Sequence, residues 1–219
     1  MNIVSIDIGL RNFSLSKEHY DLSSISKKSI PIKTKRYEKD GSATEEMRNF
    51  VQQVALCGDV QYLDKQDLGD KKEYFSGRSF QNLYKWLSNL KEDNVWDDTD
   101  VILIEQQMKT NYIATTLMHH LYAWLLIHYP TKTILLYPSK NKTRILGMAL
   151  KVEHKTTGKL VRVTKYQRKR WSIEQMKEII QKRKDDWTYQ YIFVENKKKA
   201  DDLTDVLAQN LSYIVLSLL

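Results

Sequence analysis

Short continuous runs of apolar residues mark several segments of the chain as buried strands. Residues 2–7 form the first run and residues 12–19 the second, joined by a short turn that contains Gly9. Residues 101–105 and 132–137 form two more runs, each too short for a buried helix. We therefore expect these four segments to be strands of one sheet.

Apolar residues that recur every three or four positions predict helices elsewhere. Ser42 and Glu45 have the spacing of a capping box, so a helix is expected to begin there. Further helices are predicted over about 77–92, 110–128, 168–184 and 200–218. The helix 110–128 is apolar on more than one face, which predicts burial against its own sheet on one side and against a second subunit on the other.

Other segments carry weaker signals. Residues 29–37 fit a third strand, which Pro31 would confine to a sheet edge or a strand start. Residues 58–76 are polar without a clear period and are expected to form a surface loop, whereas 150–164 alternate as a β-hairpin does. Residues 187–194 fit either a strand or a loop. The order of these elements predicts a mixed α/β layer fold.

The chain has 219 residues, the size of one large domain or of one domain with an insertion. Its 35 basic and 27 acidic side chains give a net charge of +8. That surplus favours a polyanionic partner such as nucleic acid or an acidic membrane surface, although a solvated basic protein has the same charge.

Cys57 is the single cysteine, which excludes an intramolecular disulfide and a cysteine-based zinc site. A reducing, intracellular compartment is therefore expected. Because Met1 leads directly into the predicted first strand, we expect no signal peptide. The apolar stretch 112–129 contains His119, His120 and His128 and lies between strands, so we expect no membrane span and favour packing over zinc binding for these histidines.

Four carboxylates occupy positions that a strand or helix would hold rigidly. Asp7 follows the first strand, Glu105 ends the strand 101–104, and Asp202 and Asp205 open the last helix. The last two lie three residues apart and so share a helix face, where they would repel each other without a cation. Magnesium or manganese prefers such hard oxygen ligands, although acidic residues at a helix start also serve as ordinary caps.

Three motifs resemble those of the RNase H-like Holliday junction resolvases, in particular the poxvirus and yeast mitochondrial branches. The segment 5–12, with Asp7, Gly9, Arg11 and Asn12, resembles their opening D-x-G-x-[RK]-N strand. The segment 104–107 is similar to their second motif, and 199–205 to their closing K-x-D-D-x-x-D, which in the bacterial RuvC proteins appears as A-D-x-x-D. The resemblance covers about 1–20, 100–140 and 165–219.

This resemblance implies an α/β fold: an RNase H-like mixed sheet, its first three strands antiparallel and the following ones parallel, flanked by helices. It implies one domain over residues 1–219 with an insertion at about 21–99. It also implies two Mg²⁺ ions per active site, replaceable by Mn²⁺, held by Asp7, Glu105, Asp202 and Asp205. Asp201 is an alternative to Asp202.

A basic catalytic residue is also implied, for which we predict Lys169, with Arg170 as the alternative. Other basic residues are predicted to contact nucleic acid: Arg11, Arg168, Arg170 and Lys199. The aromatic residues Trp187, Tyr189 and Tyr191 fit base stacking or a partly buried core, and we assign them no site.

The implied activity is structure-selective cleavage of four-way DNA junctions by paired symmetric nicks, carried out by a homodimer. We place the dimer interface on the helix 110–128, at Leu125 and Leu126. A viral replication compartment or an organelle matrix fits such an enzyme. The alternatives are an RNase H-like nuclease for another branched or hybrid nucleic acid, a DNA-binding module without activity, and an actin-like ATPase whose phosphate loop would be Asp67–Asp70.

Overall fold

The computed structural model describes residues 1–153, 156 and 158–219. The described chain forms two compact units, and each draws on two separate stretches of sequence. Unit 1 comprises Met1–Tyr20 and Asp59–Ser139, and unit 2 comprises Asp21–Gly58 and Lys140–Leu219. The stretch 21–99, expected as one insertion, is therefore divided between the two units.

A five-stranded sheet organises unit 1, with the strand order β3-β2-β1-β4-β5. Its strands are β1 (Asn2–Asp7), β2 (Phe13–Tyr20), β3 (Gly58–Gln66), β4 (Val101–Gln106) and β5 (Thr133–Pro138). β1 runs antiparallel to β2 and parallel to β4, and β4 runs parallel to β5. The four strands predicted from apolar runs are thus present, in the mixed sheet expected of the fold.

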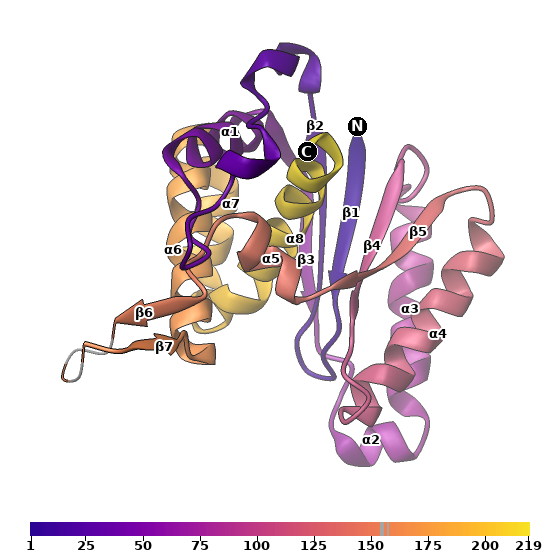
Figure 1. Ribbon diagram of the computed structural model, residues 1–219. Helices are drawn as coiled ribbons and strands as arrows, with labels where there is room; N and C mark the ends of the chain where they lie inside the picture. The colour runs from indigo at the N-terminus through magenta and orange to yellow at the C-terminus, as the bar shows by residue number, and fades with distance from the viewer. Residues whose placement is uncertain (154–155, 157) are drawn as a thin grey trace. The chain divides into compact units, whose positions relative to one another are not determined.

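Helices cover one face of this sheet (Figure 1). They are α2 (Lys71–Phe75), α3 (Arg78–Glu92) and α4 (Tyr112–His128). The apolar stripe of α3, which includes Leu83 and Leu87, and that of α4, which includes Leu117 and Leu121, are fully buried with the apolar side chains of β1 and β4. This shared core holds the strand ends in fixed positions.

The outer face of α4 differs from the prediction. Leu125 was expected at the subunit interface, but it is buried in the core of unit 1, as is Met118. Near its C-terminal end α4 exposes Leu126 and Ile127, at 45% and 76%. The apolar stripe of α4 is wide because the helix contacts both the sheet and α3.

Unit 2 is mainly helical. Its long helices are α1 (Glu45–Leu56), α6 (Lys165–Arg183) and α8 (Ala200–Leu218), and α8 contacts α1, α6 and the short α5 (Lys140–Ile145). Shorter elements are three 3₁₀ turns (Leu22–Ser24, Lys27–Ser29 and Lys33–Lys35), α7 (Asp186–Gln190), a π-helix (Tyr191–Glu195) and a 3₁₀ turn (Lys197–Lys199).

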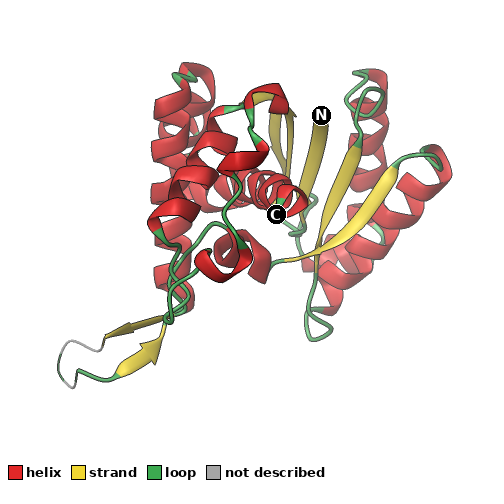
Figure 2. Ribbon diagram, turned by 45° about the horizontal axis from the view of Figure 1, so that its top comes forward, coloured by secondary structure: helices red, strands yellow, loops and turns green. Residues whose placement is uncertain are grey.

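The predicted hairpin is present in unit 2, where β6 (Lys151–Glu153) pairs antiparallel with β7 (Leu160–Arg162). It projects away from the helices of this unit (Figure 2). Part of the expected turn, at residues 154–155 and 157, lies outside the described residues. The predicted hairpin is confirmed, and Val152 pairs with Val161 in it.

Three predictions of local structure are wrong. Residues 29–37 form 3₁₀ turns and not a third strand, and the third strand lies within 58–76, the segment expected to be a loop. β3 is at the sheet edge and buries only Leu63 fully, so its sequence lacks an apolar face. Residues 187–194 are helical.

The cap of α1 is also displaced from the predicted position. Thr44, not Ser42, is the N-cap, and its hydroxyl accepts a hydrogen bond from the Met47 amide at 3.2 Å. Ser42 instead donates its hydroxyl proton to Asp40 at 2.7 Å. Among the described residues, no helix has the length and apolar character needed to cross a membrane.

Candidate active site

Asp7 and Glu105 occupy matching positions on two neighbouring strands of unit 1. Ile6 in β1 is in register with Ile104 in β4, and the two acids are the next residues along these parallel strands. Ile6 and Ile104 belong to the core under α3 and α4, so the alternation of side chains turns both carboxylates to the opposite face of the sheet. Both are partly buried, and adjacent strands lie about 4.8 Å apart.

The turn after Asp7 fixes where β1 ends. A Cβ on Gly9 would lie 2.9 Å from the backbone oxygen of Asn12, closer than any side chain tolerates, so only glycine closes this turn. The Leu10 carbonyl accepts a hydrogen bond from the Leu68 amide at 2.9 Å, which anchors the turn to the rest of unit 1. Arg11 is exposed on the same turn.

The remaining acids lie in the first two turns of α8 in unit 2. Asp201, Asp202 and Asp205 are each partly buried there, beside the fully buried Leu203. Two lysines from other elements reach them: Lys169 on α6 forms an ion pair with Asp201, and the Nζ of Lys142 on α5 lies 3.0 Å from Oδ2 of Asp205. The acidic helix start is therefore matched by cations within unit 2.

Lys169 and Asp201 shift each other's titration. The hydrogen bond to Asp201 raises the pKa of Lys169, and the negative charges of Asp201, Asp202 and Asp205 add to this effect. Burial by itself would raise the pKa of Asp201, but the hydrogen bond and charge of Lys169, together with backbone amides, hold that pKa below its usual value. At neutral pH the pair is fully ionised.

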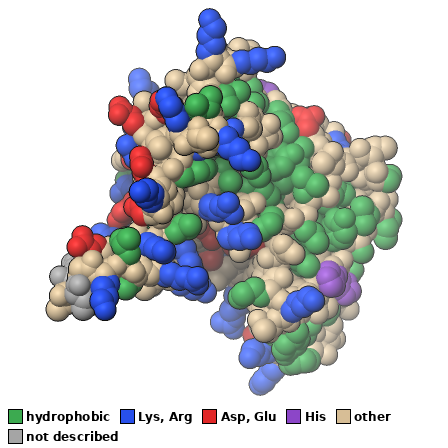
Figure 3. All heavy atoms as spheres, viewed as in Figure 1, with side chains coloured by type: hydrophobic (Ala, Val, Ile, Leu, Met, Phe, Trp, Pro, Cys, Tyr) green, Lys and Arg blue, Asp and Glu red, His purple; other side chains and the backbone are tan. Residues whose placement is uncertain are grey.

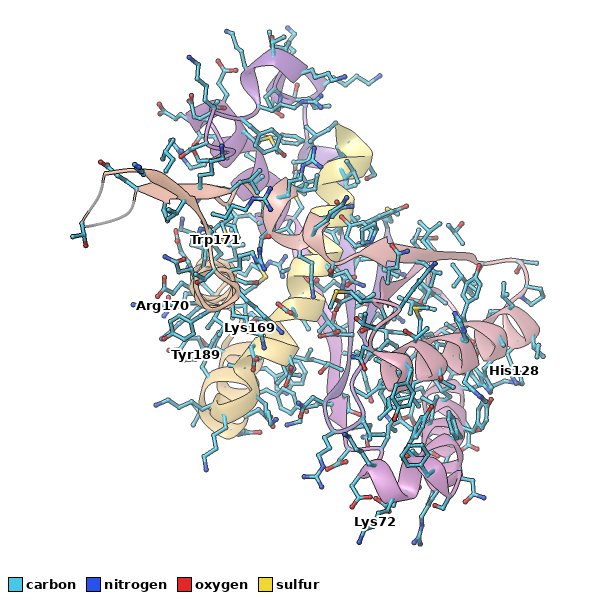
Figure 4. The ribbon with its side chains drawn as sticks, turned by 60° about the horizontal axis from the view of Figure 1, so that its bottom comes forward. Lys72, His128, Lys169, Arg170, Trp171 and Tyr189 are labelled. Atoms are coloured by element: carbon cyan, nitrogen blue, oxygen red, sulfur yellow. The ribbon has the colours of Figure 1, made fainter. Side chains whose placement is uncertain are left out.

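The two residues predicted for the basic catalytic position, Lys169 and Arg170, have different surroundings in the structure. Lys169 points from α6 toward α8, whereas Arg170 leaves the helix in another direction (Figure 4) and donates from Nε to Glu174 at 2.8 Å, one helical turn further on. Lys169 is the one that lies beside an acid of the closing motif.

Lys142 is a candidate that sequence reasoning missed. Its side chain is only 7% exposed, and a lysine is rarely buried unless it is paired. In the sequence it stands in a short polar segment after β5, with neither periodicity nor a motif to distinguish it from Lys140. Its contact with Asp205 depends on the packing of α5 against α8.

The residues predicted to bind nucleic acid lie on both units. Arg168 and Arg170 are exposed on α6, and Lys199 is partly buried as the residue before α8. Arg11 belongs to unit 1. Several Lys and Arg side chains are visible on the face of the molecule shown in Figure 3. Because they are exposed, Arg168 and Arg170 are accessible to a phosphate backbone.

Two of the three histidines of α4 take packing roles, whereas His119 is exposed. Nδ1 of His120 is 2.7 Å from the Tyr84 hydroxyl and its ring lies against Phe80, while the ring of His128 lies against Trp124. Within the described part of the chain, no group of three or more His, Cys, Asp or Glu residues is close enough to hold a metal ion. Asp7 and Glu105 follow paired residues on neighbouring strands, and Asp202 and Asp205 lie three residues apart on α8.

Comparison with known proteins supports the fold. No family model matches the sequence. Uncharacterized protein 97L of Invertebrate iridescent virus 3 is 36% identical over 118 residues, which are 54% of this chain and 49% of that protein. This chain thus matches about half the length of that relative.

Two crystal structures of the fowlpox virus Holliday junction resolvase superpose on the whole chain. One, in complex with its substrate Holliday junction DNA, has a TM-score of 0.55 at 16% identity and covers 100% of this chain and 99% of the other. The second has a TM-score of 0.53 at 15% identity, with 100% of both chains covered. The chain has the resolvase fold. The likeness at this identity is one of fold, and it confirms the mixed α/β architecture expected from the three motifs.

Proposed function

We propose that this protein is a metal-dependent endonuclease that resolves four-way DNA junctions. The observation that carries the proposal is the position of Asp7 and Glu105, side by side at the ends of β1 and β4, on the sheet face opposite α3 and α4. Two partly buried carboxylates so placed repel each other and favour a cation between them. The resolvase fold and the closing acidic motif on α8 support the same activity.

The metal ligands in this proposal are the acids implied by the three motifs: Asp7, Glu105, Asp202 and Asp205. Their carboxylate oxygens are the hard donors that magnesium and manganese prefer, so the residue types fit these ions. When bound, a pair of such ions supplies an activated water for in-line attack on the phosphodiester and stabilises the leaving 3′ oxygen.

Lys142 and Lys169 have different roles in this proposal. Lys142 holds the Asp205 carboxylate in one orientation, because its ammonium group is buried and forms an ion pair with that carboxylate. Lys169, held as a cation by Asp201, provides positive charge for the phosphate that is cut. We propose Lys142 and Lys169 together for the basic position that the sequence assigned to Lys169, with Arg170 as the alternative.

Binding is proposed to depend on the phosphate backbone, through Arg11, Arg168, Arg170 and Lys199. Because each neutralised phosphate releases counterions, affinity is expected to fall steeply with salt. The enzyme is proposed to act as a homodimer that presents two active sites, and the outer face of α4 is the proposed contact. A site of viral DNA replication is the proposed place of action, since the iridovirus relative is a viral protein.

The test is to incubate the purified full chain with a labelled synthetic four-way junction, with and without magnesium. We expect paired, symmetric nicks near the branch point that require the metal. Fork, flap and RNA–DNA hybrid substrates of the same sequence complete the panel. Faster cleavage of a hybrid or flap than of the junction would replace the proposed substrate with another nucleic acid, and absence of cleavage on every substrate would overturn the nuclease assignment.

A further inference from the structure

Unit 2 contains a cavity of about 440 Å³, a volume within the range of small-ligand sites. The buried side chains of Leu146, Met148 and Val163 form its apolar part. Trp171, one turn after Gln167 on α6, forms an aromatic wall and is partly exposed. We call this cavity the Trp171 pocket.

Polar groups complete the lining. Arg48 and the amides of Gln167 and Gln175 border the pocket. Arg48 is fixed by a hydrogen bond from Nη1 to the Ala43 carbonyl at 2.6 Å, which leaves its remaining N–H donors for another partner. Gln167 accepts a hydrogen bond at Oε1 from the Thr164 amide at 2.9 Å, so its side chain is held by the cap of α6.

An aromatic ring, an apolar floor and a few amide and guanidinium groups are the features that receive a nucleobase. The ring and floor stack on the two faces of the base, and the polar groups read its edge. The surroundings match the phosphates on either side of such a base: Lys151, Lys159 and Arg162 are exposed on or beside the hairpin strands, and Lys165 and Arg168 are exposed in the first turn of α6. An apolar peptide segment would gain nothing from this positive charge.

The pocket is close along α6 to the residue paired with the acidic motif. Trp171 follows Lys169 by two residues, which places it about 200° around the helix and about 3 Å along its axis. Figure 4 shows the two side chains leaving α6 in different directions, with Lys169 toward α8. The Trp171 pocket and Lys169 therefore lie on different sides of α6, within one helical turn of each other along its axis.

We propose that the Trp171 pocket takes one unstacked nucleobase of the DNA substrate, on the side of α6 away from Lys169. This inference rests on the proposed function, because it requires branched DNA as the substrate. A base at the branch point has lost part of its stacking, so its removal from the helix costs less than removal from a duplex. The pocket thereby makes cleavage depend on the identity of one base near the branch.

The test is a scan of the junction with single abasic sites, carried out with the full chain in the absence of metal so that binding alone is measured. At one position near the branch, loss of the base should weaken binding by the wild type about 5- to 150-fold, the effect of one base–aromatic stack. Trp171→Ala should bind the intact junction more weakly by the same factor, and the abasic site should weaken it no further.

This design separates the pocket from misfolding, because Trp171→Ala should bind the abasic junction as tightly as the wild type does. Trp171→Phe keeps a ring and should keep the sensitivity. Trp187→Ala is the matched control, since Trp187 is 53% exposed elsewhere in unit 2. The same abasic profile for the wild type and Trp171→Ala, or a profile that changes only in Trp187→Ala, would overturn the inference. Absence of junction binding by the wild type would overturn the proposed function instead.

Discussion

Asp7 and Glu105 are the residues on which the proposed chemistry depends most directly. Asp7→Asn and Glu105→Gln keep the shape of each side chain and remove its negative charge. We expect each to slow junction cleavage at least about a hundredfold, because a metal contributes several kcal/mol to the transition state. Binding of the junction, measured by gel shift, should stay equal or tighten. A parallel loss of binding would instead assign these acids a structural role.

Lys142 is important in this proposal because it is buried and paired with Asp205. Lys142→Met removes the partner of Asp205, and we expect a loss of about 1–3 kcal/mol in unfolding free energy, less than for a fully buried pair because Asp205 is 24% exposed. Cleavage should fall in the same variant, and Lys142→Arg should restore part of both. Urea unfolding and junction cleavage measure the two effects. Lys140→Met, at an exposed position of the same helix, should change neither.

Asp98 gives a prediction about pH in unit 1. The hydrogen bond and charge of Lys17 lower the pKa of Asp98 from its ordinary value of 3.8, so the ionised form is favoured in the folded state. A lowered carboxyl pKa stabilises the fold above the unfolded value, and this stabilisation is lost as the pH falls through the folded value. Asp98→Asn should therefore make the unfolding free energy depend less on pH below about pH 4.

The size of this pH effect is limited because the Asp98 side chain is 58% exposed, and we expect at most about 1 kcal/mol. Urea unfolding between pH 2 and pH 6 measures it. Asp93→Asn, at an exposed position after α3, is the control. If the unfolding free energy of Asp98→Asn falls with acid as steeply as that of the wild type, the ion pair with Lys17 contributes nothing to the stability of the fold.

At the scale of elements, the junction of α1 with the segment after α5 depends on one glycine. Gly147 has φ +87°, and a Cβ on it would lie 2.2 Å from the Cβ of Ala43. Its carbonyl accepts a hydrogen bond from the Ala43 amide at 3.0 Å. No other residue type fits this close backbone approach.

Gly147→Ala should therefore destabilise the protein by about 2–5 kcal/mol, the sum of backbone strain and overpacking. Gly77→Ala is the matched control, because Gly77 has φ +83° but no atom within 4 Å of the added Cβ. Its cost should be about 1 kcal/mol, from strain alone. Urea unfolding compares the two, and equal costs would show that the contact with Ala43 relaxes freely.

Elements with a strong apolar pattern could be predicted, and elements without one could not. β4 is buried at Val101–Ile104, so its sequence is continuously apolar. β3 exposes or half-exposes most of its residues at the sheet edge, and its polar sequence resembled a loop. The π-helix Tyr191–Glu195 has aromatic residues that are equally common in strands. The amino-acid preferences of these two segments therefore did not predict their secondary structure.

At the scale of the whole molecule, the proposed dimer is tested on α4. Leu126→Glu combined with Ile127→Glu places charges at two exposed apolar positions, and we expect a monomer whose nicks on the junction are no longer paired. Light scattering on the eluting protein measures the mass. Lys85→Glu, on the exposed face of α3, should leave the dimer intact. A double variant that remains dimeric would move the interface away from α4.

The sequence by itself determined the sheet strands with buried sides, the long helices and the identity of the motif acids. These features follow from periodicity and from short motifs, both of which involve residues that are close together in the sequence. Only the tertiary structure decided that Lys142 is buried beside Asp205, that Lys169 and not Arg170 reaches α8, and that Trp171 lines a cavity. Each of these depends on contacts between residues far apart in sequence, and no local pattern encodes the packing that creates them.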